Sequence, residues 1–204
     1  MRIISGKYKG RTIVPPRNLR ARPTTDFAKE NLFNVLVNLV DFEELDVLDL
    51  FSGTGSISYE FASRGARSVT SVEVNVVHNN FIKSTARELK FENFYAVRAN
   101  VFLYLKSCTK QFDLIFSDAP YDLDGSEEVV NLVFEKNMLA EDGILIFEHS
   151  KDKNFEGHPN LWQTRSYGSV QFSFFKKVYF FLKKSCEKIC RLKKMQYLCI
   201  AIKR

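Results

Sequence analysis

A glycine-rich turn that begins with a carboxylate is the first feature of the sequence that could bind a ligand. The segment Asp49-Leu-Phe51-Ser-Gly53-Thr-Gly55 follows a short apolar run. Glycines at a strand-to-helix turn let the backbone approach a ligand closely. A dinucleotide site would need a third glycine where this sequence has Ser58, so the match to a dinucleotide-binding motif fails. Asp49 suits a cationic or hydroxylated ligand better than a pyrophosphate.

A second carboxylate, Glu73, follows the next predicted strand. In open parallel sheets, ligands bind at the carboxyl ends of the strands, and a carboxylate there can accept hydrogen bonds from both hydroxyls of a ribose. Asp49, the glycine turn and Glu73 together predict a nucleoside ligand without a pyrophosphate, which points to S-adenosylmethionine. A plain glycine turn with Glu73 as an ordinary surface residue is the alternative.

The turn Asp118-Ala119-Pro120-Tyr121 could hold an amine for methylation. The exocyclic amine of a base is a poor nucleophile because its lone pair is delocalised into the ring. The Asp118 carboxylate and the Ala119 carbonyl would accept hydrogen bonds from the two N–H groups of the amine and so localise its lone pair. Most of the catalysis would then come from positioning the amine. Pro120 stiffens the turn, and Tyr121 offers a face on which an extruded base could stack. The same residue types are also common in ordinary turns.

These motifs lie in a chain that alternates strand and helix patterns. Short apolar strands alternating with helices of about 10–15 residues indicate βαβ units. We therefore expect an α/β, Rossmann-like fold of the class I S-adenosylmethionine-dependent methyltransferases. Its mostly parallel sheet would carry a closing antiparallel hairpin and an N-terminal hairpin-helix extension. The expected strands span 47–51, 68–72, 95–98, 112–117 and 143–147, the helices span 24–40, 57–64, 76–90 and 126–137 with a short one after 100, and the hairpins span 1–14 and 160–175.

A length of 204 residues predicts one domain with extensions. Residues 1–40 would form the hairpin, a basic loop and the first helix, and residues 41–175 the methyltransferase core. Residues 176–204 form a basic and apolar tail with no assigned role. Helical spacing places Phe27 on the apolar face of the first helix, and we expect Trp162 to lie in the core.

The net charge of +6 is distributed unevenly along the chain. Residues 1–30 carry eight basic and two acidic residues, and residues 176–204 carry ten basic residues and one acidic residue, whereas the segment between them is acidic. Basic segments beside an acidic body suggest a polyanionic partner, with ordinary solvated faces as the alternative. The candidate phosphate contacts in the N-terminal arm are Lys7, Arg11, Arg20 and Arg22.

Several classes of protein are excluded by composition. No apolar run approaches the length of a membrane span, no signal peptide opens the chain, and the four cysteines form no disulfide framework. We therefore expect a cytoplasmic protein with no stable membrane association. The three histidines have no Cys or acidic neighbours at metal-ligand spacing, so we expect no metal site.

The sequence resembles the RsmD family, bacterial methyltransferases that modify guanine N2 in small-subunit ribosomal RNA. The resemblance covers roughly residues 1–175. It implies a cofactor site at Asp49, Gly53, Gly55 and Glu73, a catalytic turn at residues 118–121 and an N-terminal basic segment that meets RNA, either as naked rRNA or within an assembled subunit. It rests on Arg2-Ile-Ile-Ser-Gly6, Gly10-Arg11, Arg22-Pro23-Thr24-Thr25-Asp26, Glu30-Asn-Leu-Phe33-Asn34, Asp49–Gly55, Glu73 and Asp118–Tyr121.

The chain departs from the family pattern at two site positions. Ala119 replaces the first of two prolines in the catalytic turn, but the backbone carbonyl survives the change. Asn100 stands where such enzymes often have an aspartate near the adenine, and its side-chain oxygen can still accept a hydrogen bond from an amino group. The tail is a third departure, and it could bind RNA or a membrane surface, pack on the sheet edge or have no selected role.

Other functions stay open at this stage. The same turn could methylate adenine N6 in DNA or RNA, or a protein glutamine. A non-catalytic RNA-binding assembly factor is suggested by Ala119 and Asn100. A nicotinamide-dependent oxidoreductase is disfavoured by Ser58.

Overall fold

The protein is described by a computed structural model that covers residues 1–16, 19, 26–121, 123 and 125–177. Arg20, Arg22 and the tail beyond residue 177 lie outside the described residues. Within the described part, no helix is both long and apolar enough to cross a membrane.

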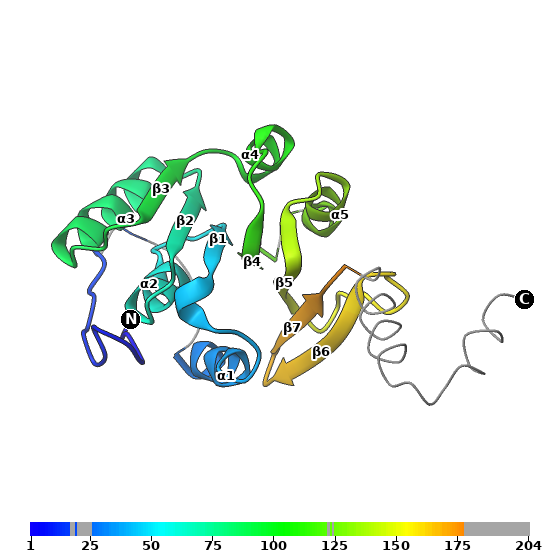
Figure 1. Cartoon of the computed structure of the whole chain (residues 1–204), viewed down its shortest axis with the longest axis horizontal. Coiled ribbons are helices and arrows are strands. Elements are labelled where there is room, and N and C mark those ends of the chain that lie inside the picture. Colours follow the sequence, from blue (N-terminus) through cyan, green and yellow to red (C-terminus); the bar gives the residue numbers. More distant parts are fainter. Residues whose placement is uncertain (17–18, 20–25, 122, 124, 178–204) are drawn as a thin grey trace, which may run out of the picture.

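A seven-stranded mixed sheet forms the centre of the molecule, with the strand order β3-β2-β1-β4-β5-β7-β6 (Figure 1). The first five strands run parallel, and β7 pairs antiparallel with both β5 and β6. This confirms the predicted Rossmann-like sheet with its closing hairpin. The strands are β1 (Asp46–Leu50), β2 (Ser68–Glu73), β3 (Phe94–Arg98), β4 (Phe112–Ser117), β5 (Leu139–Ser150), β6 (Leu161–Tyr167) and β7 (Val170–Phe175).

Helices cover both faces of this sheet (Figure 1). One face carries α1 (Asp26–Leu36), α2 (Ser56–Ser63) and α3 (Val76–Glu88), and the other carries α4 (Val101–Ser107) and α5 (Glu128–Glu135). A short 3₁₀ helix, η1 (Phe42–Glu44), leads into β1. Because both faces are covered, β1, β2 and β4 are buried along nearly their whole length, as continuous apolar strands of parallel sheets are.

The structure corrects three expectations. Helix α1 ends at Leu36 rather than near residue 40, and hydrogen-bonded turns follow it. Phe27 is 65% exposed, because the buried stripe of α1 contains Ala28, Leu32 and Leu36 and Phe27 lies on the opposite side of the helix. Trp162 is 36% exposed rather than in the core, and the Lys176 Nζ lies 3.9 Å from its ring centroid.

The N-terminal segment forms the expected hairpin and is also bound to α2. Arg2 and Thr12 form an antiparallel bridge, and the Ile3 N–H donates to the Arg11 carbonyl at 3.0 Å. The buried Glu60 carboxylate on α2 accepts hydrogen bonds from the backbone N–H groups of Ile4 at 2.7 Å and Ser5 at 3.0 Å. Buried acceptors of this kind satisfy donors that would otherwise be costly to bury.

Helix α1 is tied to the same segment by a buried lysine. Lys29 Nζ donates to the Arg2 carbonyl at 2.6 Å and to the Ser56 hydroxyl at 3.1 Å, and burial lowers the pKa of Lys29. Since Ser56 is the first residue of α2, this contact places the first turns of α1 at the carboxyl edge of the sheet. Helix α1 therefore runs antiparallel to the neighbouring strands.

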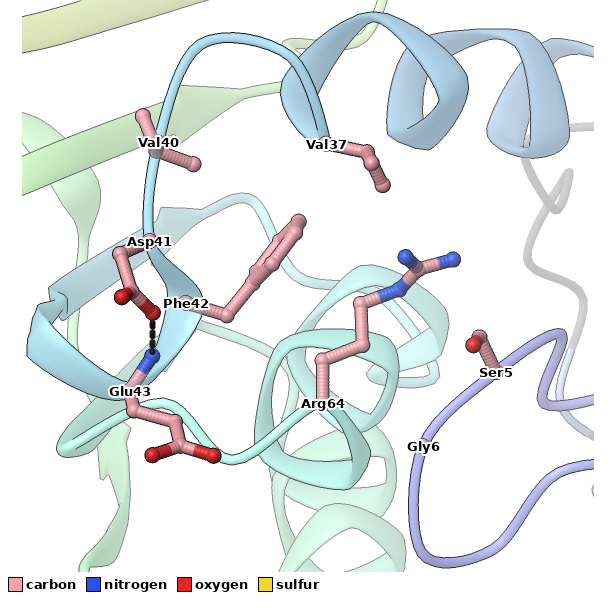
Figure 2. A pocket seen from close by; sticks show the side chains of 8 residues that line it. All are labelled: Ser5, Gly6, Val37, Val40, Asp41, Phe42, Glu43 and Arg64. Carbon is pink, nitrogen blue, oxygen red and sulfur yellow. Dashed lines mark hydrogen bonds between the residues drawn. The ribbon is translucent and has the colours of Figure 1, made fainter.

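A hollow of about 430 Å³ lies at the opposite, amino edge of the sheet (Figure 2). Ser5 and Gly6 line one side, Phe42 and the Arg64 side chain line the base, and the end of α1 covers the other side. Here Asp41 Oδ1 accepts a hydrogen bond from the Glu43 backbone N–H at 3.2 Å. The hollow contains none of the predicted cofactor-binding and catalytic residues, because those lie at the carboxyl edge. The predicted RNA contact Lys7 directly follows Gly6, which lines the hollow.

Candidate active site

The predicted site residues meet at the carboxyl edge of three parallel strands. From β1 the chain moves outward to β2 and β3 and then returns to β4 on the other side of β1. The boundary between β1 and β4 is thus the switch point at which sheets of this type bind ligands. Asp49 lies near the end of β1, Glu73 ends β2, and Asp118 follows β4. The negative charges of Asp118 and Glu73 both contribute to raising the pKa of Asp49, so the three carboxyl groups are close in space.

The Asp49 carboxyl group is fully enclosed in the protein. Burial raises its pKa from 3.8 to about 7, and the nearby acids add to that effect. The Ser58 hydroxyl on α2 donates to Asp49 Oδ2 at 2.5 Å and partly opposes the rise in pKa. A buried carboxyl group with a pKa near neutrality is suited to a ligand that brings positive charge.

Ser58 is a hydrogen-bond partner of Asp49 that the sequence analysis missed. Its position was noted only because a dinucleotide motif would have glycine there. The sequence did contain a signal for this contact. Ser58 lies in the first turn of α2, two residues after the N-terminal Ser56, and from there its side chain points back to the end of β1.

The glycine turn is held in a left-handed backbone conformation. Phe51 has φ of 56°, Gly53 of 54° and Gly55 of 83°. A Cβ on Gly55 would lie 2.8 Å from Cζ of Tyr59, so glycine is required there on steric as well as conformational grounds. The Ser52 hydroxyl donates to the Asp49 carbonyl at 2.8 Å and fastens the turn to the strand end.

Glu73 connects the glycine turn to the end of β2. Its Oε2 accepts from the Gly53 N–H at 2.9 Å, and its Oε1 accepts from the Asn75 N–H at 2.7 Å. Each carboxylate oxygen has a further lone pair with which it could accept a ribose hydroxyl. The next residue, Val74, is 58% exposed and offers an apolar surface beside this carboxylate.

Asn100 caps α4 in this structure. Its side-chain oxygen accepts from the Leu103 N–H at 3.2 Å, as an N-cap residue does. Asn100 is exposed at the carboxyl edge, and Leu103 beside it is 68% exposed. The predicted contact of Asn100 with an adenine would therefore use the second lone pair of the same oxygen.

The turn at residues 118–121 continues from β4 beside the glycine turn. The Asp118 N–H donates to the Leu50 carbonyl at 3.5 Å, which extends the pairing of β4 with β1 by one residue. Ala119 is 3% exposed and packs into the core under α4 and α5, whereas Pro120 is exposed and Tyr121 is 39% exposed. The small buried Ala119 side chain thus anchors a turn in which Asp118 is half-buried and Pro120 and Tyr121 are exposed.

The two described basic candidates lie on the N-terminal segment. Lys7 is exposed, and its backbone N–H donates to the Ser63 carbonyl at 2.7 Å. The Arg11 guanidinium forms an exposed ion pair of 2.5 Å with Glu88 on α3. Exposed pairs of this type contribute little to stability and exchange readily for another anion. Arg20 and Arg22 lie outside the described residues.

Comparison with known proteins decides the family. A sequence model described as "Conserved hypothetical protein 95" matches residues 1–176. Ribosomal RNA small subunit methyltransferase D of Buchnera aphidicola subsp. Baizongia pistaciae is 32% identical over 163 residues, which are 79% of this chain and 83% of that protein. The protein of the same name from Escherichia coli K12 is 31% identical, over 79% of this chain and 81% of its own length. The chain belongs to the RsmD family.

Solved structures agree with the RsmD assignment. The putative methyltransferase yhhF from Escherichia coli is 26% identical, with a TM-score of 0.76 and coverage of 87% of this chain and 97% of that one. The putative methylase HI0767 from Haemophilus influenzae is 29% identical, with a TM-score of 0.70 and coverage of 85% and 96%. The class I methyltransferase fold is thereby confirmed, and the chain is a methyltransferase.

The carboxyl edge of this RsmD-family chain offers two adjoining sets of groups. Asp49, the left-handed turn and Glu73 form a cradle for a ligand with a cation and hydroxyl groups. Asp118 and the Ala119 carbonyl are two hydrogen-bond acceptors at the next strand end. A donor of a methyl group and an amine acceptor could therefore be held side by side.

Proposed function

We propose that this chain transfers a methyl group from S-adenosylmethionine to the N2 amine of a guanine in small-subunit ribosomal RNA. The observation that supports the proposal is the pairing of the Asp118 N–H with the Leu50 carbonyl, since residues 118–121 thereby lie directly beside the glycine turn. The family to which the chain belongs, and the names of its relatives, support ribosomal RNA as the substrate and hence the cytoplasm as the compartment.

The residues present fit S-adenosylmethionine. Burial and two neighbouring acids raise the pKa of the enclosed Asp49 carboxyl to about 7, and a ligand with positive charge would stabilise its ionised form. The turn at Gly53 and Gly55 places backbone without side chains at the strand end, and the buried Glu73 carboxylate beside it could accept ribose hydroxyls. Asp49, Phe51, Gly53, Gly55, Glu73 and Asn100 would hold the cofactor.

The protein would promote the transfer by position and electrostatics. When bound, the sulfonium supplies a methyl group and leaves as a neutral thioether, so no strong base is required beforehand. Asp118 and the Ala119 carbonyl accept hydrogen bonds from the two N–H groups of the amine and so direct its lone pair toward the methyl carbon. As the new N–C bond forms, the amine loses one proton, which the Asp118 carboxylate is placed to accept.

The target guanine must reach the site without its partner base. Guanine N2 lies on the Watson–Crick edge, so the base has to be unpaired or flipped out of its helix. Tyr121 is exposed at the site and could stack on the extruded base. Lys7, Arg11, Arg20 and Arg22 would contact phosphates on the same RNA.

The proposal is tested by labelled methyl transfer from S-adenosylmethionine to small-subunit particles and, in parallel, to deproteinised small-subunit rRNA. Both substrates should come from cells that lack this protein. N2-methylguanosine as the labelled nucleoside is the expected product. Label in N6-methyladenosine or in protein would reassign the substrate, and no incorporation with intact cofactor binding would favour a non-catalytic RNA-binding role.

A further inference from the structure

A second carboxylate, Glu148, lies level with the amine-binding turn on the neighbouring strand. Strands β4 and β5 are parallel, and Ser117 is paired with Phe147 at their carboxyl ends. Asp118 and Glu148 are the next residues on the two strands. Adjacent strands lie about 4.8 Å apart, so the two residues occupy neighbouring positions at the edge of the sheet.

Strand alternation places Glu148 on the face that α1 and α2 cover. Ile144 and Ile146 of β5 belong to the core beneath these helices, whereas Leu145 and Phe147 belong to the core of the opposite face. Glu148 continues the first set, because side chains alternate along a strand. It is 4% exposed.

The same face carries the other two acids of the site. Asp49 reaches the Ser58 hydroxyl on α2, and the Asp118 charge acts on Asp49. On its other side Glu148 pairs in register with Phe172 of β7, which is fully buried. The Glu148 carboxyl group therefore lies between an apolar strand and the end of β4, near the first turns of α1.

Two carboxylates at neighbouring positions match the edge of one base in particular. Guanine presents N1–H and N2–H as adjacent donors, whereas adenine presents N1 as an acceptor. We propose that Glu148 is a specificity-determining residue that accepts the guanine N1–H while Asp118 and the Ala119 carbonyl hold the N2 amine. This inference rests on the proposed function and deepens it, because it explains how the site would choose guanine over adenine.

The physical reason for selectivity is the cost of a mismatched buried acceptor. A guanine gives Glu148 a donor for a charge-assisted hydrogen bond. A base with a lone pair at N1 sets two acceptors against each other in a site closed to water, and such mismatches lower reactivity strongly. Glutamine at this position would remove the charge and supply an amide N–H, which can donate to an N1 lone pair.

The test uses 2-aminopurine, which keeps the N2 amine but has a lone pair at N1. Small-subunit RNA is prepared with guanine or 2-aminopurine at the nucleotide found by the labelling experiment, and is used free or reconstituted into particles according to which form is the substrate. The wild-type protein should methylate guanine at least about 100-fold faster than 2-aminopurine. Glu148→Gln should lose about 10- to 100-fold on guanine, gain on 2-aminopurine and so reduce the preference.

Controls separate this role from a structural one. Glu141→Gln changes an exposed acid at the amino end of the same strand and should leave the preference and the rate unchanged. Cofactor affinity and melting temperature of Glu148→Gln show whether the site is intact. Full guanine activity in Glu148→Gln, or an equal loss on both bases, would overturn the inference. Absence of methyl transfer to guanine by the wild-type protein would instead overturn the proposed function itself.

Discussion

The Ser58 hydroxyl donates to the buried Oδ2 of Asp49 across 2.5 Å, and this bond joins the start of α2 to the end of β1. It is a partner that favours the ionised carboxyl group in a setting where burial and two neighbouring acids favour the neutral one. The balance leaves the pKa of Asp49 at about 7, so its charge changes within the physiological range.

Cofactor binding should therefore depend on pH through Asp49. A cationic ligand prefers the ionised carboxylate, and that form is lost as pH falls through about 7. If only the ionised form binds, affinity for S-adenosylmethionine should be about tenfold lower at pH 6 than at pH 8. Calorimetric titration at both values measures the ratio. Asp49→Asn should bind more weakly at both and lose this dependence, and a wild-type affinity that does not change with pH would contradict the role.

The same shift should be visible in protein stability. In the unfolded chain Asp49 ionises near 3.8, whereas in the folded protein it holds its proton up to about pH 7. The folded state is therefore favoured at low pH, and the free energy of unfolding should decrease by an amount of order a few kcal/mol between about pH 4 and pH 7. Urea unfolding of the wild type and Asp49→Asn across this range isolates the contribution, because the variant lacks it. If the free energy of unfolding changed with pH in the same way in the wild type and in Asp49→Asn, the contribution of Asp49 would be refuted.

Replacement of Asp118 should separate catalysis from cofactor binding. Asp118→Ala removes an acceptor for the amine, and we expect methyl transfer to decrease at least about 100-fold. Because the Asp118 charge contributes to raising the pKa of Asp49, its removal should lower that pKa and leave cofactor affinity at pH 6.5 equal to or slightly above that of the wild type. Single-turnover transfer and calorimetry measure the two effects. Wild-type turnover in this variant would show that the turn is not catalytic.

Glu73 should matter for both the cofactor and the loop. Glu73→Ala deletes the acceptor of the Gly53 and Asn75 N–H groups, so we expect a loss of about 1–3 kcal/mol in stability and weaker cofactor binding. Glu73→Gln keeps one acceptor oxygen, so its stability and its cofactor affinity should lie between those of the wild type and of Glu73→Ala. Unchanged cofactor affinity in Glu73→Ala would exclude the ribose contact.

Two glycines of the N-terminal segment provide a matched pair. Gly6 and Gly10 have φ of 81° and 83°, so alanine is strained to a similar degree at both. A Cβ on Gly6 would lie 1.8 Å from the Ser63 carbonyl oxygen, whereas a Cβ on Gly10 would meet nothing within 4 Å. Gly6→Ala should therefore be the less stable variant by about 2 kcal/mol or more in urea unfolding. Equal losses would mean that the segment is not held against α2.

Local patterns in the sequence were sufficient for the class of fold and for the order of the motifs. Strand β4 lies at the predicted residues 112–117, and the closing hairpin turns between Tyr167 and Val170 as expected. Alternation, apolar runs and turn residues are properties of a few consecutive residues, so the chain itself displays them. The family motifs at Asp49–Gly55 and Asp118–Tyr121 are local in the same way.

Tertiary structure alone decided which side chains meet. The bond from Ser58 to Asp49, the anchoring of Ile4 and Ser5 by Glu60, and the position of Glu148 beside Asp118 all depend on strand order and register. Phe27 shows the converse, since it is an apolar residue of α1 but lies on the side of the helix turned away from the buried stripe. Contacts between distant segments arise from packing that no short stretch of sequence specifies, which is why the motifs could be recognised one by one whereas the partners of their side chains could not.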